Sequence, residues 1–309
     1  MSLLTVGSVA FDAIETPFGK TDKIIGGAGT YIALSAAFFE KNQNIVAVVG
    51  DDFPKEMLET LTSRGVNLDG LQVKDGEKTF FWSGKYHNDM NTRDTLVTEL
   101  NVLEHFDPIV PQSYQNTEFL MLGNLSPQVQ ATVVSRLKNR PKLIAMDTMN
   151  FWMDIAMDDL KKTISQVDLL IVNDEEARQL SGEYSLVKAA DAIRKLGCKY
   201  LIIKKGEHGA LLFHGDKLFV APALPLESVF DPTGAGDTFA GGLMGYLSST
   251  NDISFENMKR GIIAGSALAS FCCEKFGTEQ LTSISSQEVN DRIQKFTEIA
   301  HFDMSNVEA

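Results

Sequence analysis

Short, unbroken apolar runs that alternate with helical sequence are the feature that most limits what this chain can fold into. The runs occupy residues 3–6, 45–49, 119–122, 143–146, 169–172 and 200–203. Apolar runs without alternation are typical of strands buried on both faces, as in a parallel sheet. The segments between them, such as 31–40 and 127–138, show helical periodicity. The order predicts a doubly wound, mostly parallel sheet flanked by helices, an α/β fold.

Small and polar residues stand where these runs end. They are Gly7, Gly50, Gly123, Asp147, Asn173 and the segment 204–206. Ligands of open parallel sheets bind beyond the carboxyl ends of the strands. Glycine, asparagine and aspartate also begin turns for purely structural reasons. The set as a whole, rather than any single member, therefore predicts a ligand site at this edge, and Asp147 is a candidate magnesium contact.

Two segments break the alternation and predict a second, smaller sheet. Residues 13–24 and 71–98 read as strands and turns, and the second is rich in Thr, Phe, Trp, Val and Tyr. Because both follow strand ends, we expect them to form a small β lid over the site. The main domain is then 1–12, 25–70 and 99–309. The lid's aromatic residues could cover an apolar part of a substrate or serve the lid's own packing.

Charge and composition exclude several classes of partner. The formal net charge is −13, and such a surface repels nucleic acid. No run of about 18 apolar residues predicts a membrane span. Residues 1–7 lack the basic and small-residue features of a secretion signal, so we expect a cytoplasmic protein. Three cysteines form no disulfide framework, and the five histidines show no metal-ligand spacing.

The most specific chemical signal is the segment 230–242, which reads FDPTGAGDTFAGG. A Gly-Ala-Gly turn leads directly into an amphipathic run. The free N–H groups at such a helix start carry partial positive charge, and glycines let a phosphate approach them. Asp237 falls in the first turn, where a carboxylate could take the proton of an attacking hydroxyl. The alternative is that Asp237 only complements the helix dipole.

Residues 231–237 resemble the carboxy-terminal signature of the ribokinase, or pfkB-type, carbohydrate kinase family. Four other segments resemble further family elements in the same order, so that the resemblance covers nearly the whole chain. They are 6–12, 26–31, 173–177 and 205–209. The resemblance implies a ribokinase-like fold and transfer of the γ-phosphate of ATP to a hydroxyl of a small-molecule sugar or nucleoside. It also implies Mg²⁺ and, in many members, activation by a monovalent cation such as K⁺.

The resemblance also implies roles for individual residues. Asp237 would be the catalytic base. The anion hole would be formed by Gly234, Ala235 and Gly236. The substrate hydroxyls would be held by Asp12, Gly26 and Gly27, with Tyr31 beside them. Phosphate and Mg²⁺ would be organised, largely through water, by Asn173 and Glu176. The nucleotide would be bordered by Lys205, Gly206 and Gly209. A monovalent cation would be held by Asp231 and Thr233.

Some of these residues have a structural alternative. Asn173 and Glu176 also have the spacing of a capping box that opens a helix. Gly26 and Gly27 could simply make a tight entry into the next helix. Tyr31 departs from the family, because many members have asparagine there. A phenol is bulkier and could stack on a ring or form a hydrogen bond through its hydroxyl, so the resemblance leaves open whether the acceptor is ribose or adenosine, as in the best-known members.

The functional hypothesis is an ATP-dependent sugar kinase, with nucleoside kinase as its nearest variant. A non-catalytic sugar-binding regulator on the same fold would be expected to lack the base or the anion hole, and both are present. A dinucleotide-dependent oxidoreductase is disfavoured because 26–29 lacks the G-x-G-x-x-G spacing. In this family an exposed lid often pairs with a second lid, which implies a homodimer.

Overall fold

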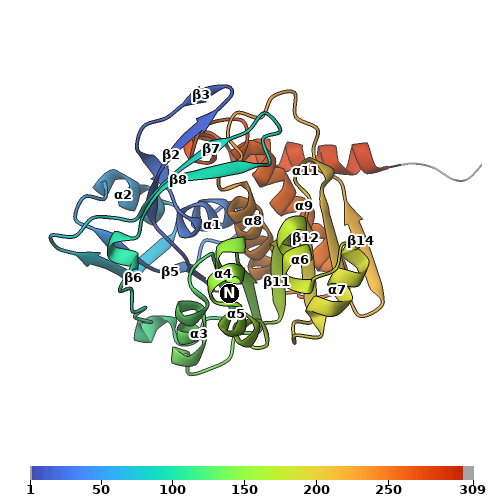
Figure 1. Ribbon diagram of the computed structural model, residues 1–309, viewed down its shortest axis with the longest axis horizontal. Helices are drawn as coiled ribbons and strands as arrows, with labels where there is room; N and C mark the ends of the chain where they lie inside the picture. Colours follow the sequence, from blue (N-terminus) through green and yellow to red (C-terminus); the bar gives the residue numbers. More distant parts are fainter. Residues whose placement is uncertain (1, 302–309) are drawn as a thin grey trace, which may run out of the picture.

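The computed structural model describes residues 2–301, which form a nine-stranded and a five-stranded sheet (Figure 1). The order of the large sheet is β14-β13-β12-β11-β10-β9-β1-β5-β6. Its strands are β1 Leu3–Val6, β5 Gln43–Gly50, β6 Val66–Lys74, β9 Phe119–Leu122, β10 Leu143–Asp147, β11 Leu169–Asn173, β12 Tyr200–Lys204, β13 Ala210–His214 and β14 Lys217–Ala221. Pairing is parallel except between β12, β13 and β14. All six apolar runs lie in its strands, which confirms the predicted fold class.

Helices cover both faces of the large sheet. One face carries α1 Ala28–Ala36, α8 Ala235–Thr250 and α9 Phe255–Cys272. The other carries α3 Pro127–Arg136, α4 Asn150–Ile155, α5 Met157–Ile164, α6 Asp174–Ser181 and α7 Leu186–Arg194. The remaining helices are α2 Lys55–Ser63, α10 Glu279–Ser283 and α11 Ser286–Ala300. Within residues 2–301, no helix combines the length and apolarity that crossing a membrane requires.

Strand alternation decides which side chains face which helices. In β11, Leu169 and Ile171 pack on the α8 side, whereas Leu170 and Val172 pack on the opposite side. Every second residue of a strand points to the same face. A polar residue that ends a strand therefore continues one of these two rows, and its position in the row fixes the side of the sheet on which it acts.

Close helix packing fixes the position of α8. A Cβ atom on Gly241 would lie 2.3 Å from the Ile32 carbonyl oxygen of α1, and one on Gly265 of α9 would lie 2.4 Å from the Phe239 carbonyl oxygen of α8. Only glycine permits such an approach. The helix is therefore held tightly between α1 and α9, and its first turn is directed at the carboxyl ends of the strands.

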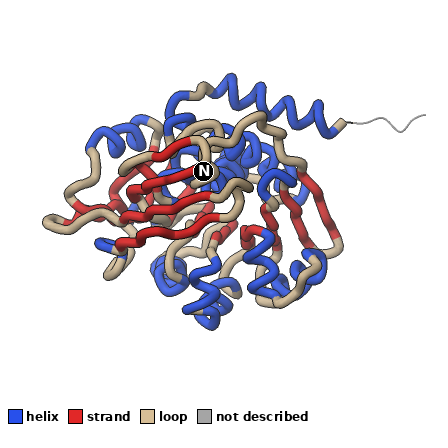
Figure 2. Tube along the Cα trace, turned by 45° about the horizontal axis from the view of Figure 1, so that its top comes forward, coloured by secondary structure: helices blue, strands red, loops and turns tan. Residues whose placement is uncertain are grey.

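The small sheet stands apart from the large one (Figure 2). It consists of β2 Ala10–Thr16, β3 Gly19–Lys20, β4 Ile24–Gly26, β7 Phe81–Tyr86 and β8 Arg93–Glu99. Its boundaries differ from the expected 13–24 and 71–98. Residues 71–74 belong to β6, which pairs with β5 in the large sheet, and the small sheet already begins at Ala10. The runs 66–74 and 81–86 are both β-rich, so that composition alone does not separate them.

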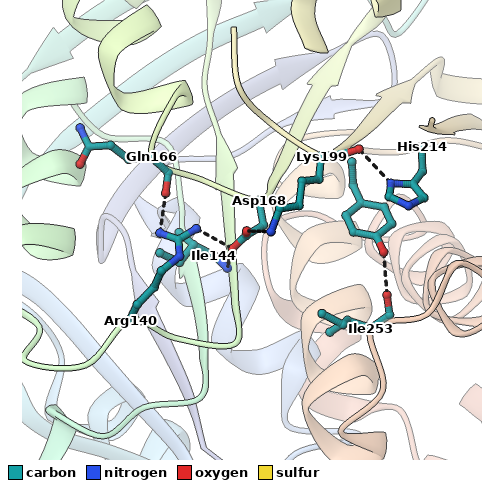
Figure 3. A network of polar contacts seen from close by, with 8 residues as sticks. Arg140, Ile144, Gln166, Asp168, Lys199, His214 and Ile253 are labelled. Carbon is teal, nitrogen blue, oxygen red and sulfur yellow. Dashed lines mark hydrogen bonds and ion pairs between the residues drawn. The ribbon is translucent and has the colours of Figure 1, made fainter. Parts of the chain in front are cut away.

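At the amino ends of the strands, one buried carboxylate joins three neighbouring strands (Figure 3). Asp168 accepts hydrogen bonds from Arg140 (Nη2 to Oδ2, 2.9 Å), Lys199 (Nζ to Oδ1, 3.2 Å) and the Ile144 N–H (3.1 Å). These contacts connect the starts of β10, β11 and β12. They lie at the opposite end of the sheet from the polar strand ends.

Candidate active site

Three polar residues end adjacent strands on the α8 side of the sheet. Asp147, Asn173 and Lys204 are the last residues of β10, β11 and β12, and Asn173 and Lys204 are paired across the ladder. Each continues the row of residues that packs against α8, for example Tyr200 and Ile202 in β12. The sheet therefore directs a carboxylate, an amide and an ammonium group to the start of α8.

The turn before α8 positions Asp237. Gly234 has φ +74°, a left-handed conformation that favours glycine. The Ala235 N–H donates to the Pro232 carbonyl (3.1 Å) and thereby closes the turn. The N–H groups of Gly236 and Asp237 lie at the open helix end, where a phosphate binds most readily. Of the three residues of the expected anion hole, Gly234 and Ala235 shape the turn, and the Gly236 N–H lies at the open helix end.

Asp231 connects the motif, residues 231–237, to the segment that follows α9 through hydrogen bonds. Its Oδ1 accepts the Thr233 N–H (2.8 Å) and its Oδ2 accepts the Gly277 N–H (2.9 Å). The side chain is fully buried, and this burial raises the pKa of Asp231 while the two N–H groups lower it. Both carboxylate oxygens therefore already hold the loop in shape.

The environment of Asp237 suits a base that works near neutral pH. Burial, reinforced by the charge of Asp147, raises the pKa of Asp237 to about 7. Lys204 and Arg93 act in the opposite direction. A carboxylate with such a pKa can accept a proton from a hydroxyl more readily than an ordinary aspartate, whose pKa is about 4.

Asp12 lies near Asp237 and is buried, whereas Asp237 at the start of the helix is partly exposed. Burial raises the pKa of Asp12 to about 7, with Asp231 and Asp237 adding to the shift and the Gly27 N–H opposing it. A Cβ atom on Gly26 would lie 1.9 Å from Asp12 Oδ2, so only glycine fits beside this carboxylate. Gly26 and Gly27 therefore bring the backbone directly against the Asp12 carboxylate.

Asn173 and Glu176 form a capping box at the start of α6, as their spacing in the sequence allowed beside a role in binding. Asn173 Oδ1 accepts the Glu176 N–H and Glu176 Oε2 accepts the Asn173 N–H, both at 2.7 Å. Burial raises the pKa of Glu176 to about 7, with Lys204 lowering it and Asp147 raising it. The box fixes both side chains at the sheet edge and leaves Glu176 Oε1 and the Asn173 amide nitrogen outside these two bonds.

Two further residues, Lys204 and Tyr86, lie near the motif, and the sequence gives little indication that they do so. Lys204 donates to Asp147 Oδ2 (3.4 Å), and its side chain is only 18% exposed. Its sequence signal is its position at the end of an apolar strand, in the row that faces α8. Tyr86 of β7 accepts a hydrogen bond from the Thr233 hydroxyl (3.1 Å). Nothing in the local sequence of β7 indicates that long-range contact.

The small sheet also reaches the predicted nucleotide loop. In that loop, the Lys205 N–H donates to the Gly209 carbonyl (2.7 Å), and Gly206 and Gly209 both have positive φ. A Cβ atom on Gly206 would lie 2.8 Å from Oδ1 of Asn91, which lies in the β7–β8 turn. The lid therefore extends from Asp12 in β2 to the nucleotide loop.

Tyr31 lies in the core beneath the motif. Its side chain is 1% exposed, and its ring faces Gly234, where a Cβ atom would lie 2.5 Å from the ring carbons. The hydroxyl has no hydrogen-bond partner among residues 2–301. This position explains why a bulky ring is accepted: it supports the Gly234 turn from below.

The acidic residues near the start of α8 fit a divalent cation whose ligands are chiefly phosphate oxygens and water. Three carboxylates surround Lys204 and leave an excess of negative charge, namely those of Asp147, Glu176 and Asp237. No cluster of three or more His, Cys, Asp or Glu side chains within residues 2–301 could hold a metal by itself. Mg²⁺ commonly binds through phosphate oxygens, water and only one or two carboxylates, and this donor set matches that pattern.

Comparison with known proteins agrees with the geometry. Residues 2–284 match the model of the pfkB family carbohydrate kinases. A cytidine kinase from Thermococcus kodakarensis is 32% identical over 253 residues, which are 80% of this chain and 88% of that protein. A Burkholderia thailandensis nucleoside kinase in complex with inosine has a TM-score of 0.77 at 19% identity, covering 96% of this chain and 99% of that one. An Escherichia coli chain assigned as ribokinase II, in complex with ATP and Mg²⁺, has a TM-score of 0.76 at 19% identity, with coverages of 95% and 99%.

Proposed function

The chain belongs to the pfkB family of carbohydrate kinases, and on that premise we propose that its acceptor is a nucleoside, phosphorylated on a ribose hydroxyl. That it is an ATP-dependent kinase acting on a sugar or nucleoside hydroxyl follows from the family and from its named relatives. The proposal adds the class of acceptor and the role of each residue.

Asp237 supports the kinase chemistry. In the transfer, an oxygen–phosphorus bond forms between the acceptor hydroxyl and the γ-phosphorus, and the bond from that phosphorus to the bridging oxygen breaks. The electron pair of the broken bond stays with ADP, and the hydroxyl proton passes to the Asp237 carboxylate. The Gly236 and Asp237 N–H groups bind the oxygens of the transferred group. Mg²⁺ would neutralise phosphate charge, and Glu176 and Asn173, whose side chains are fixed by their capping box, would hold it through water.

Asp12 supports the acceptor end of the site. A buried carboxylate accepts two hydroxyl donors well, and a ribose presents vicinal hydroxyls. Asp12 is paired with Trp82 of β7 in the small sheet. Lys205, Gly206 and Gly209 form the loop that would border the nucleotide at the other end.

The observation that favours a nucleoside over a free sugar is an aromatic row on the inner face of the lid. Trp82, Gly84 and Tyr86 alternate along β7, and Tyr86 contacts the motif through Thr233, so this row faces the site. The Trp82 ring lies over Gly84, where a Cβ atom would approach it to 2.1 Å, and the side chain is partly exposed. A flat, partly exposed ring on the same face of the small sheet as its ladder partner Asp12 is a suitable surface for stacking a base.

An ADP-release assay with matched acceptors tests this proposal. Cytidine, uridine, adenosine and inosine are compared with ribose, fructose and sugar phosphates. We expect kcat/KM to be highest for a nucleoside. Trp82→Ala should raise the KM for that nucleoside by about tenfold, since base stacking contributes on the order of 1–3 kcal/mol, and should leave ribose turnover unchanged. Equal losses for the nucleoside and ribose, or a preference for a free sugar, would contradict the nucleoside proposal.

Two finer features belong to the same proposal. A homodimer through the lid is supported by β8, an edge strand whose seven residues are all exposed, including Leu96 and Val97. Light scattering measures the mass of the protein in solution, and a monomer at all concentrations would contradict the homodimer.

A K⁺ ion near Asp231 and Thr233 rests on the resemblance alone, because the carboxylate oxygens of Asp231 already accept two N–H groups. Comparing turnover in K⁺ and Na⁺ buffers tests it.

A further inference from the structure

Lys204 is a lysine inside the site whose position the proposed roles do not explain. It ends β12 in the row of Tyr200 and Ile202, which pack toward α8 and α9. Its side chain is 18% exposed, and its Nζ lies 3.4 Å from Asp147 Oδ2. The neighbouring Lys205 belongs to the nucleotide loop and continues the opposite row, so the two lysines have different surroundings.

The Lys204 ammonium group lies directly against the start of α8. A Cβ atom on Gly236 would lie 2.8 Å from Lys204 Nζ. Gly236 is the second residue of α8, and its missing side chain is what allows this approach. An ammonium group and the open N–H groups of the helix therefore border the same small volume.

Burial disfavours the ammonium form of Lys204, but the charges of Asp147, Glu176 and Asp237 outweigh this effect and raise the pKa of Lys204. The start of a helix carries partial positive charge, and a cation is normally stabilised at the other end. An anion between Lys204 and the α8 N–H groups would satisfy both donors at once.

We propose that Lys204 binds the transferred phosphoryl group directly, its ammonium donating to a γ-phosphate oxygen beside the N–H groups that begin α8. The inference rests on the proposed function, since it takes the γ-phosphate to lie at that helix end. Lys204 has three N–H donors, and the Asp147 contact uses one of them. Because the charge on the transferred group is shared among its oxygens throughout the transfer, Lys204 acts on both ATP and the transition state.

The competing explanation is that Lys204 only neutralises Asp147 and the other buried carboxylates. In that case, adding Lys204→Met to Asp147→Asn should cost no further activity, and the double variant should recover to the kcat of Asp147→Asn alone. If Lys204 binds the phosphoryl group, removing Asp147 as well cannot replace the lost donor. The two explanations therefore differ in one double variant.

The experiment compares Lys204→Met, Asp147→Asn and the double variant with the wild type. ATP and ADP affinities are measured by calorimetry in Mg²⁺ without acceptor, and kcat is measured with the best acceptor. We expect Lys204→Met to weaken ATP binding by at least about tenfold, as for a hydrogen bond to a charged group, and to change ADP binding by less than about twofold. We also expect kcat to fall at least about 100-fold, with no recovery in the double variant.

Lys199→Met is the matched control. Lys199 stands just before β12 at the opposite end of the sheet and pairs with Asp168 (Figure 3), so the same change of charge there should leave both affinities and kcat unaltered. Lys204→Gln, which keeps a donor for Asp147 without the charge, serves if the methionine variant does not fold. Equal weakening of ATP and ADP, or recovery of kcat in the double variant, would overturn the inference. The affinity comparison needs no acceptor, so it is decided even if the nucleoside proposal fails.

Discussion

Asp237 carries out its proposed chemistry because opposing influences act on one carboxylate. Burial and Asp147 raise its pKa to about 7, while Lys204 and Arg93 hold the pKa from rising further. A base is effective when its pKa is close to the working pH. The free enzyme should therefore show a kcat/KM that rises with pH through about 7, because the unprotonated carboxylate is the active form.

The substitution Asp237→Asn separates the base from a helix-capping carboxylate. Asparagine keeps the shape but cannot accept the proton, so kcat should fall at least about 100-fold. ATP affinity should change little, because the N–H groups at the helix start remain. Steady-state kinetics and calorimetry measure both quantities. A folded variant that keeps more than about a tenth of the wild-type kcat would remove Asp237 from the proton transfer.

Tyr31 offers a second test at the scale of one residue. Its hydroxyl is buried without a partner and its ring supports Gly234, so we expect a packing role rather than contact with substrate. Tyr31→Phe should leave the acceptor KM and the melting temperature close to the wild type, whereas Tyr31→Ala should cost about 3 kcal/mol of stability, as for other buried aromatic residues. A tenfold rise in acceptor KM in Tyr31→Phe would show that the hydroxyl binds substrate.

At the scale of elements, the sequence predicts strands most accurately where an unbroken apolar run coincides with burial on both faces of the sheet. All six apolar runs lie in strands of the large sheet, because a strand buried on both faces cannot alternate. The pair β13–β14 was not identified, since Lys217–Ala221 is largely exposed and has a mixed composition. The boundary at 71–74 was wrong because β6 is an edge strand, partly exposed, whose composition matches that of the lid.

The candidate site shows the same division between local and long-range information. The Gly234 turn, the start of α8 and the Asn173–Glu176 capping box are local, and the sequence indicates all three. Lys204 beside Gly236, Tyr86 beside Thr233 and Asn91 beside Gly206 join segments far apart in the chain. Such contacts depend on how the lid and α8 are placed on the sheet, which no local pattern encodes.

The lid strand β8 supplies a prediction at this scale. Arg93 is paired across the ladder with Tyr86, and paired residues share a face of a sheet, so Arg93 points toward the motif. Its charge lowers the pKa of both Asp237 and Glu176. Arg93→Gln should therefore reduce kcat/KM for the acceptor at least about tenfold and move the rise of kcat/KM to higher pH.

Lys85→Gln is the control for Arg93, because Lys85 lies on the same hairpin and pairs with Glu15. It should leave both kcat/KM and the pH profile unchanged. If Arg93→Gln behaves like Lys85→Gln, the lid acts only as a cover and contributes no charge to the site.

For the whole molecule, the two ends of the sheet have opposite characters. At the amino ends, Asp168 is paired with Arg140 and Lys199, and the contacts hold strands together. At the carboxyl ends, buried carboxylates outnumber the cations near them. Asp12 and Asp237 each have a pKa of about 7 instead of the usual 3.8. The protein therefore carries at its site a charge arrangement that lowers stability and is relieved when cations and substrates bind.

This arrangement predicts a specific dependence of stability on pH. Between about pH 4 and 7, the unfolded chain has released the protons of Asp12 and Asp237 while the folded protein still holds them, so stability falls as pH rises through this window. The double variant Asp12→Asn/Asp237→Asn lacks the two ionisations. It should be more stable than the wild type at pH 8 by at least about 1 kcal/mol, since one pKa unit corresponds to 1.36 kcal/mol, and the difference should be less than half as large at pH 5. Melting curves of both proteins at the two pH values measure this difference in stability. The other titrating groups are common to the two proteins and cancel in the comparison. A difference in stability of the same size at pH 5 and pH 8 would mean that Asp12 and Asp237 do not have raised pKa values.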